Sequence, residues 1–293
     1  HGKAFGLTAQ ARFLQFAAFT FDICITEIIT TLLYGGCVCI PSESSRRSNL
    51  AKAVDDMRVN WAYLTPTVAR LLDPDSVPSL KTLILGGEEV SSADCKRWSD
   101  KVNIINAYGP AECTVLCTAY FGIQGFKSGL IGKSIASVCW VVDPENHDRL
   151  APLGSIGELL IEGPILARGY LNDPQKTKAA FIDDPTWLLQ GGGGHPGRRG
   201  RMYKSGDLAY YAPDGNLMYA ARKDGQVKLR GLRVELGEVE HHLRECIPEA
   251  QQSAVEVIMP AGEKENATLA AFLQLDDGGR PHQSGRQDGR LST

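Results

Sequence analysis

Apolar and polar positions in the first 117 residues follow the periods of helices and of buried strands in turn. Short apolar runs predict buried strands at 37–40, 61–64, 82–85 and 102–106. Apolar residues three or four positions apart predict helices at 23–34, 49–57, 67–72 and 91–98. Ser91 and Asp94 resemble a capping box at the start of the last helix. Strands separated by short helices imply right-handed crossovers and a largely parallel sheet.

The carboxyl ends of these strands carry residues with distinctive chemistry. They are Tyr63, the turn Gly86-Gly87-Glu88 and the run Asn106-Ala107-Tyr108-Gly109. In sheets of this kind, ligands bind beyond the carboxyl ends of the strands. We therefore expect the three loops to meet at one edge of the sheet.

A different pattern begins at about Thr118. Short alternating segments between Gly, Pro and Asp turns predict antiparallel strands at 138–142, 157–161, 202–203 and 216–219. Beyond Asp224 a smaller unit begins, with a strand, a helix and two further strands predicted at 226–230, 236–246, 254–258 and 268–275. The chain therefore combines an α/β part, a β-rich part and a small α+β part.

These patterns divide the chain into four regions. Residues 1–117 form the α/β sheet of a large subdomain, and residues 118–223 form its β-rich, barrel-like part. Residues 224–275 start a small subdomain, and the polar tail 276–293 is predicted to be disordered. The glycine run 191–194 predicts a flexible surface insertion. No amphipathic helix follows this run, which argues against a phosphate-binding loop.

Composition limits the class of protein. The 293 residues are 43% hydrophobic and 22% charged, which is typical of a soluble globular protein with a substantial core. A net charge of −3 gives no support for a binder of nucleic acid or of anionic surfaces. No apolar run approaches the roughly 20 residues that cross a bilayer, and no leader is evident, so we expect a cytoplasmic location. The eight cysteines include no C-x-x-C pair, which favours buried free thiols over disulfides or a zinc site.

A cluster of cations lies around one short strand near the start of the small unit. Strand alternation explains the apolar Val227 and Leu229, but it does not explain the neighbouring cations, which are Arg222, Lys228, Arg230 and Arg233. Cations beside an Asp-Gly turn point to an anionic ligand, and a nucleotide at a bend between two domains fits this pattern.

Three stretches together resemble a known family. They are Asn106-Ala-Tyr-Gly-Pro-Ala-Glu112, Tyr203-Lys-Ser-Gly-Asp-Leu208 and Arg222-Lys-Asp-Gly-Gln-Val-Lys-Leu-Arg-Gly231. Each alone has an ordinary explanation as a turn. In this order, the chain from Phe19 to Leu275 resembles adenylate-forming enzymes, and among those the adenylation domains of fungal nonribosomal peptide synthetases. The resemblance extends to Phe21-Asp-Ile-Cys-Ile-Thr-Glu27, to Gly86-Gly-Glu88, and to Gly157–Gly163 with Ala167–Leu171.

The resemblance implies a two-step reaction. A substrate carboxylate attacks the α-phosphate of ATP, which gives an aminoacyl adenylate and pyrophosphate. The acyl group then passes to the phosphopantetheine thiol of a carrier domain, so that peptidyl carrier and condensation domains are the implied partners. Positioning and electrostatic stabilisation by cations and Mg²⁺ would account for most of the catalysis.

The family's nucleotide site maps onto named positions. Tyr108 would stack on adenine beside Gly87, Glu88 and Tyr219, and Asn106 and Gly109 belong to the same motif. Glu112 would hold Mg²⁺, for which a hard carboxylate is suited. Asp207 would accept hydrogen bonds from the ribose, while Arg222 and Lys228 would donate to ribose or phosphate. Asp224 would be the hinge of the small domain.

The family's amino-acid pocket maps in the same way. Asp22 would pair with the α-ammonium group of the substrate, and the alternative for Asp22 is an ordinary helix N-cap. The remaining lining would comprise Ile23, Thr26, Tyr63, Ile84, Gly86, Ala107, Val115 and Leu116. Apart from Asp22 none of these is charged, so we expect a substrate with an uncharged side chain, apolar or aromatic. Gly86 and Ala107 would leave depth in the pocket, and Tyr63 would limit it.

The chain also departs from the family. We expect it to be a piece of a longer protein, because the chain begins with His1 and lacks both the family's phosphate loop and its carboxy-terminal lysine. Ala111 replaces a usual Thr, and Ala221 replaces a usual Gly. We therefore expect this chain by itself to be weakly active or inactive. The alternatives are an acyl- or aryl-CoA ligase of the same superfamily, and a non-catalytic remnant that binds nucleotide or acts as a scaffold.

Overall fold

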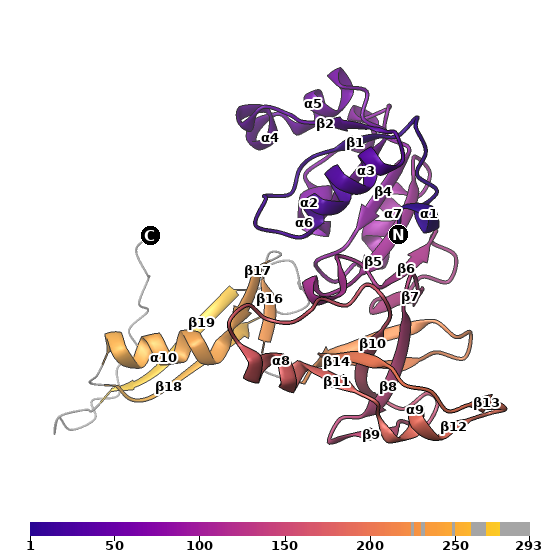
Figure 1. The fold of residues 1–293 in the computed structure, drawn as a ribbon. Helices are drawn as coiled ribbons and strands as arrows, with labels where there is room; N and C mark the ends of the chain where they lie inside the picture. The colour runs from indigo at the N-terminus through magenta and orange to yellow at the C-terminus, as the bar shows by residue number, and fades with distance from the viewer. Residues whose placement is uncertain (224–225, 230–231, 248–249, 259–267, 276–293) are drawn as a thin grey trace. The chain divides into compact units, whose positions relative to one another are not determined.

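The chain consists of two units, residues 1–224 with 230–232 and residues 225–229 with 233–293 (Figure 1). The computed structural model describes residues 1–223, 226–229, 232–247, 250–258 and 268–275. The predicted hinge Asp224 and the predicted disordered tail 276–293 lie outside these described residues.

The first unit begins with a parallel sheet. Its strands are ordered β2-β1-β3-β4-β5, and every neighbouring pair in this run is parallel. The strands are β1 (Arg12–Leu14), β2 (Cys37–Cys39), β3 (Trp61–Leu64), β4 (Thr82–Leu85) and β5 (Asn103–Tyr108). The parallel sheet expected from the strand and helix alternation is therefore confirmed.

Short helices connect these strands. They are α1 (Gly2–Phe5), α2 (Ile23–Ile25), η1 (Thr26–Thr30), α3 (Thr31–Leu33), α4 (Glu43–Ser48), α5 (Leu50–Asp56), α6 (Pro66–Arg70), η2 (Pro74–Ser76) and α7 (Ser92–Trp98). The predicted capping box is present: Ser91 Oγ accepts from Asp94 N, and the Asp94 side chain accepts from Ser91 N. The helix expected at 23–34 contains a π-helical turn, η1, at its centre.

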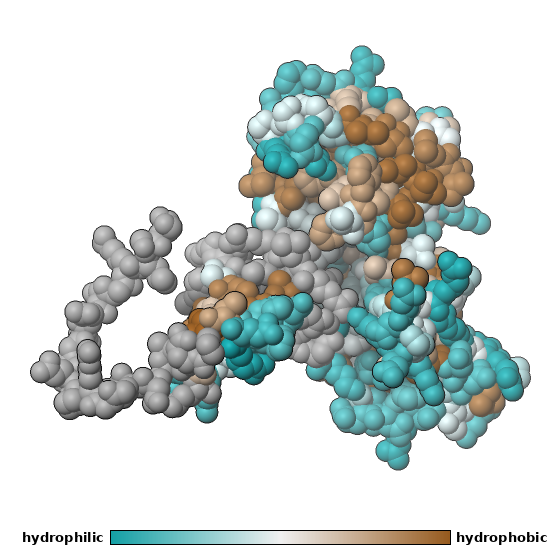
Figure 2. Space-filling view, turned by 60° about the vertical axis from the view of Figure 1, so that its left-hand side comes forward, coloured by the Kyte–Doolittle hydropathy of each residue, from teal (hydrophilic) through white to brown (hydrophobic). Residues whose placement is uncertain are grey.

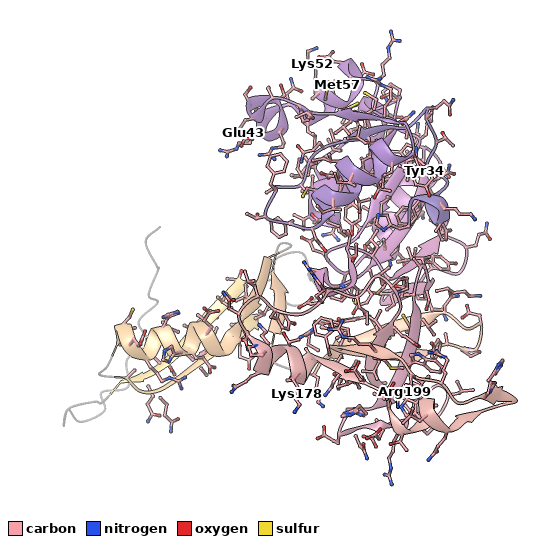
Figure 3. The ribbon with its side chains drawn as sticks, in the orientation of Figure 1. Tyr34, Glu43, Lys52, Met57, Lys178 and Arg199 are labelled. Carbon is pink, nitrogen blue, oxygen red and sulfur yellow. The ribbon has the colours of Figure 1, made fainter. Side chains whose placement is uncertain are left out.

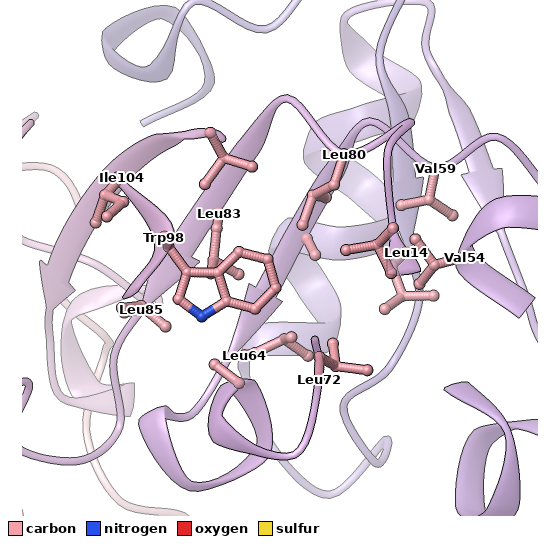
Figure 4. Packing of buried hydrophobic residues seen from close by; sticks show 14 of the residues in the cluster. Leu14, Val54, Val59, Leu64, Leu72, Leu80, Leu83, Leu85, Trp98 and Ile104 are labelled. Atoms are coloured by element: carbon pink, nitrogen blue, oxygen red, sulfur yellow. The ribbon is translucent and has the colours of Figure 1, made fainter. Parts of the chain in front are cut away.

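The core of the parallel part lies between the sheet and its helices. Trp98 of α7 is 1% exposed and packs with Leu83 and Leu85 of β4 (Figure 4). Charged side chains such as Glu43 of α4 and Lys52 of α5 point outward from the unit (Figure 3). Apolar side chains are therefore removed from water while charged side chains remain solvated, which stabilises the folded unit.

Antiparallel strands continue the same sheet. The order onward from β5 is β6-β7-β15-β14-β10-β8-β9, and the pairing changes from parallel to antiparallel between β5 and β6. The strands are β6 (Thr118–Phe121), β7 (Leu130–Ser134), β8 (Val138–Asp143), β9 (Asn146–Leu150), β10 (Gly157–Glu162), β14 (Arg201–Tyr211) and β15 (Leu217–Arg222). The change of pattern predicted near Thr118 therefore falls where the strand direction changes. Strand β14 is far longer than the segment 202–203 predicted for it.

The glycine run that was expected to be a flexible surface insertion starts a short, exposed hairpin of β12 (Gly191–Gly192) and β13 (His195–Pro196). Helix α8 (Pro174–Ala180), strand β11 (Phe181–Asp183) and helix α9 (Thr186–Gln190) precede this hairpin. Gly191, with φ of 69°, starts the hairpin, and a glycine tolerates this angle without strain. Arg198 anchors the hairpin because its Nη2 donates to Glu162 Oε2 at 2.8 Å.

The second unit contains two strand pairs and one helix. Strands β16 (Gln226–Leu229) and β17 (Leu232–Glu235) pair, and β18 (Ala250–Ile258) pairs antiparallel with β19 (Thr268–Leu275). Helix α10 (Leu236–Cys246) has the predicted bounds. Glu240 Oε1 accepts from Val255 N at 3.0 Å, which joins α10 to β18.

All eight cysteines are free thiols, and six of them are buried. Among the described residues, every helix is too short or too polar to span a bilayer.

Candidate functional site

The three predicted loops follow neighbouring strands. Leu64 of β3 pairs with Leu85 of β4, and Leu85 pairs with Asn106 of β5, so the carboxyl ends of these strands are adjacent. Gly86 continues β4, and a Cβ atom placed on it would lie 2.1 Å from Tyr63 Oη. Only glycine fits beneath the Tyr63 ring. Tyr63, the Gly86 turn and the end of β5 therefore share one edge of the sheet.

Tyr108 and Asp207 meet through their side chains. Tyr108 lies at the end of β5 and Asp207 lies within β14, and Tyr108 Oη donates a hydrogen bond to Asp207 Oδ2. Burial, and after it the nearby Asp207 charge, raises the pKa of Tyr108 well above its ordinary value. The phenol therefore stays protonated and remains a donor to Asp207.

Arg222 completes this group. It lies on β15 directly opposite Asp207, and its Nη1 donates to Asp207 Oδ1 at 3.1 Å and to Ser205 O at 2.8 Å. Gly206, with φ of 69°, lies under the guanidinium, since an added Cβ would be 2.9 Å from Arg222 Nη2. Asp207 is 6% exposed, and a buried carboxylate needs such a partner.

Tyr108, Asp207 and Arg222 are thus brought together, although Tyr108 and Asp207 are 99 residues apart in sequence. We refer to these three residues as the Tyr-Asp-Arg cluster. Tyr219 of β15 packs against the same hydrophobic cluster as Tyr108. Lys223, which follows Arg222, donates its backbone N–H to Gly206 O at 2.8 Å and holds the end of β15 in place.

Glu88 is held at the start of helix α6. Its Oε2 accepts from Thr67 N at 3.1 Å and from Thr67 Oγ1 at 2.7 Å. Its Oε1 is buried without a hydrogen-bond partner in the described part of the chain. Gly87, with φ of 81°, turns the chain between β4 and Glu88. A buried acceptor without a partner can receive a hydrogen bond from a bound molecule.

Asn106 and Gly109 shape the segment around Tyr108. Asn106 Nδ2 donates to Leu130 O at 2.5 Å and so ties β5 to β7. A Cβ on Gly109 would lie 2.4 Å from Val115 O, so the chain returns against it closely. These two residues fix the position of Tyr108 through the backbone.

Glu112 lies in the short helix η3 (Ala111–Cys113). Its Oε1 accepts from Tyr170 Oη at 2.6 Å. The backbone just beyond is strained, with φ of 75° at Val115, a value that β-branched residues rarely adopt. Among the described residues no three His, Cys, Asp or Glu side chains form a metal cage. Mg²⁺ does not need such a cage, because it commonly binds one or two carboxylates together with phosphate oxygens.

Asp22 stands at the first turn of the helix that begins with α2. Its backbone is already helical, with φ of −65° and ψ of −21°, and its side chain makes no capping hydrogen bond. Asp22 thus occupies the N-cap position of α2 without capping it through its side chain. Thr26 is fully buried in η1, and Ile23 packs against the hydrophobic cluster that contains Tyr63.

The rest of the predicted pocket lining belongs to that cluster. Its members are 0–5% exposed and comprise Tyr63, Ile84, Ala107, Val115 and Leu116. Because Tyr63 Oη fills the space above Gly86, the depth expected at Gly86 is absent. Burial is the main cause that raises the pKa of Tyr63, and the charges of Asp22 and Glu27 add to it.

One predicted site residue cannot be placed beside the others. Lys228 belongs to β16, but its side chain lies outside the described residues, as does Asp224. Three contributing residues were missed by the sequence analysis. Ser205 accepts from Asp207 N at 3.0 Å, Tyr170 orients Glu112, and Glu27 lies fully buried in η1. All three residues lie inside the family motifs quoted in the sequence analysis, and membership of those motifs was the only sequence signal that could have identified them.

Comparison with known sequences identifies one family and relatives among the fungal nonribosomal peptide synthetases. The family described as AMP-binding enzyme matches residues 1–171. The chain is 58% identical over 280 residues to the nonribosomal peptide synthetase TES of Alternaria alternata, covering 94% of this chain and 5% of that protein. It is 48% identical over 274 residues to peramine synthetase A of Epichloe festucae, covering 94% of this chain and 10% of that protein. The chain thus spans a small part of the curated relatives that it matches.

Comparison with solved structures supports the same fold. PA1221, a protein with adenylation and PCP domains, matches with a TM-score of 0.77 and 28% identity over 94% of this chain and 55% of that chain. The Vibrio cholerae adenylation domain AlmE, in complex with glycyl-adenosine-5'-phosphate, matches with a TM-score of 0.76 and 31% identity over 92% of this chain and 51% of that chain. The chain spans about half of each solved protein.

Proposed function

Since this chain belongs to the family of AMP-binding enzymes, we propose that it is part of the adenylation domain of a nonribosomal peptide synthetase. The domain would activate an amino acid with ATP to an aminoacyl adenylate. The observation that carries this proposal is the Tyr-Asp-Arg cluster, which joins three separate motifs at one place in the first unit. The 58% identity to a fungal synthetase supports it.

The cluster offers the groups that a nucleotide needs. The Tyr108 ring would provide the stacking surface for adenine, and the unpartnered Oε1 of Glu88 would accept a hydrogen bond at its edge. Both Asp207 oxygens already accept from protein donors, but a carboxylate has about four acceptor sites, so ribose hydroxyls can share it. Arg222 would hold Asp207 in place and donate to ribose or phosphate. Lys228 would add a further donor.

Mg²⁺ fits the residues around Glu112. The carboxylate is a hard ligand, and Tyr170 fixes its orientation by donating to Oε1. Bound there, the ion would neutralise charge on the phosphate oxygens. Glu112 itself would position the phosphates relative to the substrate carboxylate.

The amino acid would bind beside Asp22. This carboxylate would pair with the α-ammonium group, which lowers the cost of partial burial for both charges. The remaining lining is uncharged and is largely closed by Tyr63, which favours a small or flat uncharged side chain, apolar or aromatic. The activated acyl group would then pass to the phosphopantetheine thiol of a peptidyl carrier domain, with a condensation domain as a further partner. Asp224 would be the hinge between the two steps. This chain alone, without the remainder of the domain, would adenylate weakly or not at all.

Amino-acid-dependent ATP–pyrophosphate exchange tests the proposed function. A polypeptide with the whole adenylation domain that includes this chain should exchange pyrophosphate with one or a few uncharged amino acids. The substitution Asp22→Ala should lower this exchange at least about 100-fold, since the ammonium group loses its counter-charge. Exchange that survives Asp22→Ala with carboxylic acids lacking an amine would instead show an acyl- or aryl-CoA ligase. Nucleotide binding without exchange on any acid would show a non-catalytic remnant.

A further inference from the structure

The helix that carries Asp22 buries its polar face. It runs through α2, η1 and α3. Its inward side chains Thr26, Glu27 and Thr31 are fully buried. Its outward side chains are apolar and 44–78% exposed, and they are Ile25, Ile29, Leu32 and Leu33. The π-helical turn of η1 holds Glu27, and such turns often occur at functional sites. A buried carboxylate is costly unless it is satisfied, so the partners of Glu27 decide what it does.

Glu27 accepts hydrogen bonds from one short segment. Its Oε2 accepts from Phe16 N at 3.1 Å and from Gln15 Nε2 at 3.3 Å, and both of its oxygens lie 3.1 Å from Ala17 N. All of these partners are donors, so an ionised carboxylate, which only accepts, matches them. We refer to residues 15–17 and Glu27 together as the Glu27 latch.

The segment held by the latch directly follows β1, which ends at Leu14. Gln15 N donates to Cys39 O at 2.8 Å, so the segment begins on the sheet. Arg46 of α4 donates from Nη1 to Phe16 O at 3.1 Å, which fixes its other side. The latch therefore joins the sheet to the helix across the turn that leads to Asp22.

The latch lies within electrostatic reach of the predicted amino-acid pocket. The charges of both Asp22 and Glu27 act on Tyr63 and on Cys24, and they add to burial in raising the pKa of each. Glu27 nevertheless has no place in the binding scheme proposed above. Its contacts are with the backbone that presents Asp22.

We propose that Glu27 is a positioning residue for amino-acid binding, because its carboxylate fastens residues 15–17 to the helix that presents Asp22 and Thr26. The proposal rests on the proposed function, since it assumes that Asp22 binds the substrate amine. Loss of the latch would let this helix shift relative to the sheet, so substrate affinity would fall while the groups around the nucleotide stayed in place.

The charge of Glu27 changes near neutral pH. Burial raises the pKa of Glu27 to about 7. The hydrogen bonds from Ala17, Phe16 and Gln15 and the charge of Arg46 act in the opposite direction and lower it. The other titratable groups that face it are Asp22 and Cys24 on its own helix, Tyr63 on β3, and His1, which contacts Thr26 and Thr30. When Glu27 is protonated, one of its oxygens carries a proton and faces N–H groups that are themselves donors. Protonation at low pH therefore weakens the latch.

Substrate affinity and stability should therefore respond to pH in opposite directions. A carboxyl group whose pKa is higher in the folded state than in the unfolded state binds more protons when folded, so Glu27 lowers stability as pH rises from about 4.5 to about 7. The latch requires the ionised form, so KM for the amino acid should rise about tenfold as pH falls from 8 to 6. A merely structural Glu27 would change stability alone.

The test is the pH profile of amino-acid-dependent pyrophosphate exchange in the whole adenylation domain that includes this chain. For Glu27→Gln, whose amide places a donor against N–H groups, KM for the amino acid at pH 8 should rise about tenfold, kcat should change less than about threefold, and the profile between pH 6 and 8 should be flat. Glu27→Asp, which restores the charge, should recover part of the pH dependence. His1, Asp22 and Tyr63 remain in every variant, so their titration cannot produce the difference.

The matched control is Asp94→Asn, which alters another buried carboxylate, 5% exposed, far along the chain in the capping box of α7. It should leave KM unchanged. A Glu27→Gln protein with the wild-type KM and the wild-type pH profile would overturn the proposal. If that variant does not fold, a wild-type KM that is constant from pH 6 to 8 would overturn it. Failure of the proposed function looks different, because the wild type would then show no amino-acid-dependent exchange at any pH.

Discussion

Individual residues in this protein are explained best by their contacts across the sheet. Gly206 is an example, because its role is visible only when Arg222 is placed above it. The Asp207 motif alone suggested an ordinary glycine turn. The structure shows why position 206 excludes a side chain. A Cβ there would contact the Arg222 guanidinium, which neutralises Asp207.

The substitution Gly206→Ala should destabilise the protein and weaken nucleotide binding. Its φ of 69° strains an alanine by about 1 kcal/mol or more, and the added Cβ also displaces Arg222. The matched control is Gly215→Ala, where φ is 77° but no atom lies within 4 Å. Both variants should lose stability in urea, and only Gly206→Ala should also lose affinity for ATP. Equal affinities in the two variants would contradict the role given to Gly206.

Some strands and helices were predicted with their observed bounds from local patterns, and part of what was missed has a physical cause. The period of apolar residues gave β3 and β4 with their observed bounds. It could not give the full length of β14, since this strand contains Gly206 and a register shift that interrupt the alternation. The hairpin at Gly191 was not predicted, because Arg198 anchors it to Glu162, which lies 36 residues earlier in the sequence.

The helix through α2, η1 and α3 shows another limit of local patterns. The apolar stripe of a helix usually faces the core, yet Ile29 and Leu33 are 48% and 78% exposed. Figure 2 shows hydrophobic residues gathered over the upper part of the unit, where Figure 1 places α1 to α3. The polar face is inside because Glu27 and Thr26 have partners there. Only the three-dimensional contacts reveal this reversal.

The contribution to stability of the ion pair between helices α6 and α7 should depend on pH. Asp94 pairs with Arg70 at 2.7 Å and caps α7 through Ser91. Burial acts to raise the pKa of Asp94, but the hydrogen bonds from Arg70 and Ser91 outweigh it and hold the pKa below its ordinary value of 3.8. Its contribution to stability is therefore complete above about pH 4 and is lost as pH falls through the lower folded pKa.

The substitution Asp94→Asn should remove this contribution. At pH 7 it should cost about 2 kcal/mol of unfolding free energy, because Arg70 loses its counter-charge while the amide keeps part of the cap. Urea unfolding at pH 7 and at about pH 3 measures it. The difference between wild type and variant should shrink at the lower pH, and a difference that does not change with pH would rule out the ionised pair as its source.

At the scale of the whole molecule, the sequence predicted which motifs converge but not how they contact one another. Tyr108, Asp207 and Arg222 were assigned by resemblance, and the structure brings them into one hydrogen-bonded cluster. The resemblance implied that Tyr63 would limit the pocket, but not that its Oη would lie directly beside Gly86, because that depends on side-chain packing. The two units of the chain divide beside Asp224, the position predicted as the hinge, whose role stays a prediction.

The central claim is that the Tyr-Asp-Arg cluster binds AMP as part of an aminoacyl adenylate. Calorimetric titration with a nonhydrolysable aminoacyl-adenylate analogue tests this most directly, with the whole adenylation domain that includes this chain and its Arg222→Ala variant. Arg199→Ala is the control, because Arg199 is 88% exposed and pairs with Asp184 at the surface. The account predicts that Arg222→Ala weakens binding at least about tenfold, since Asp207 loses its charged partner, and that Arg199→Ala leaves binding unchanged. Equal affinity in all three folded proteins would contradict the account.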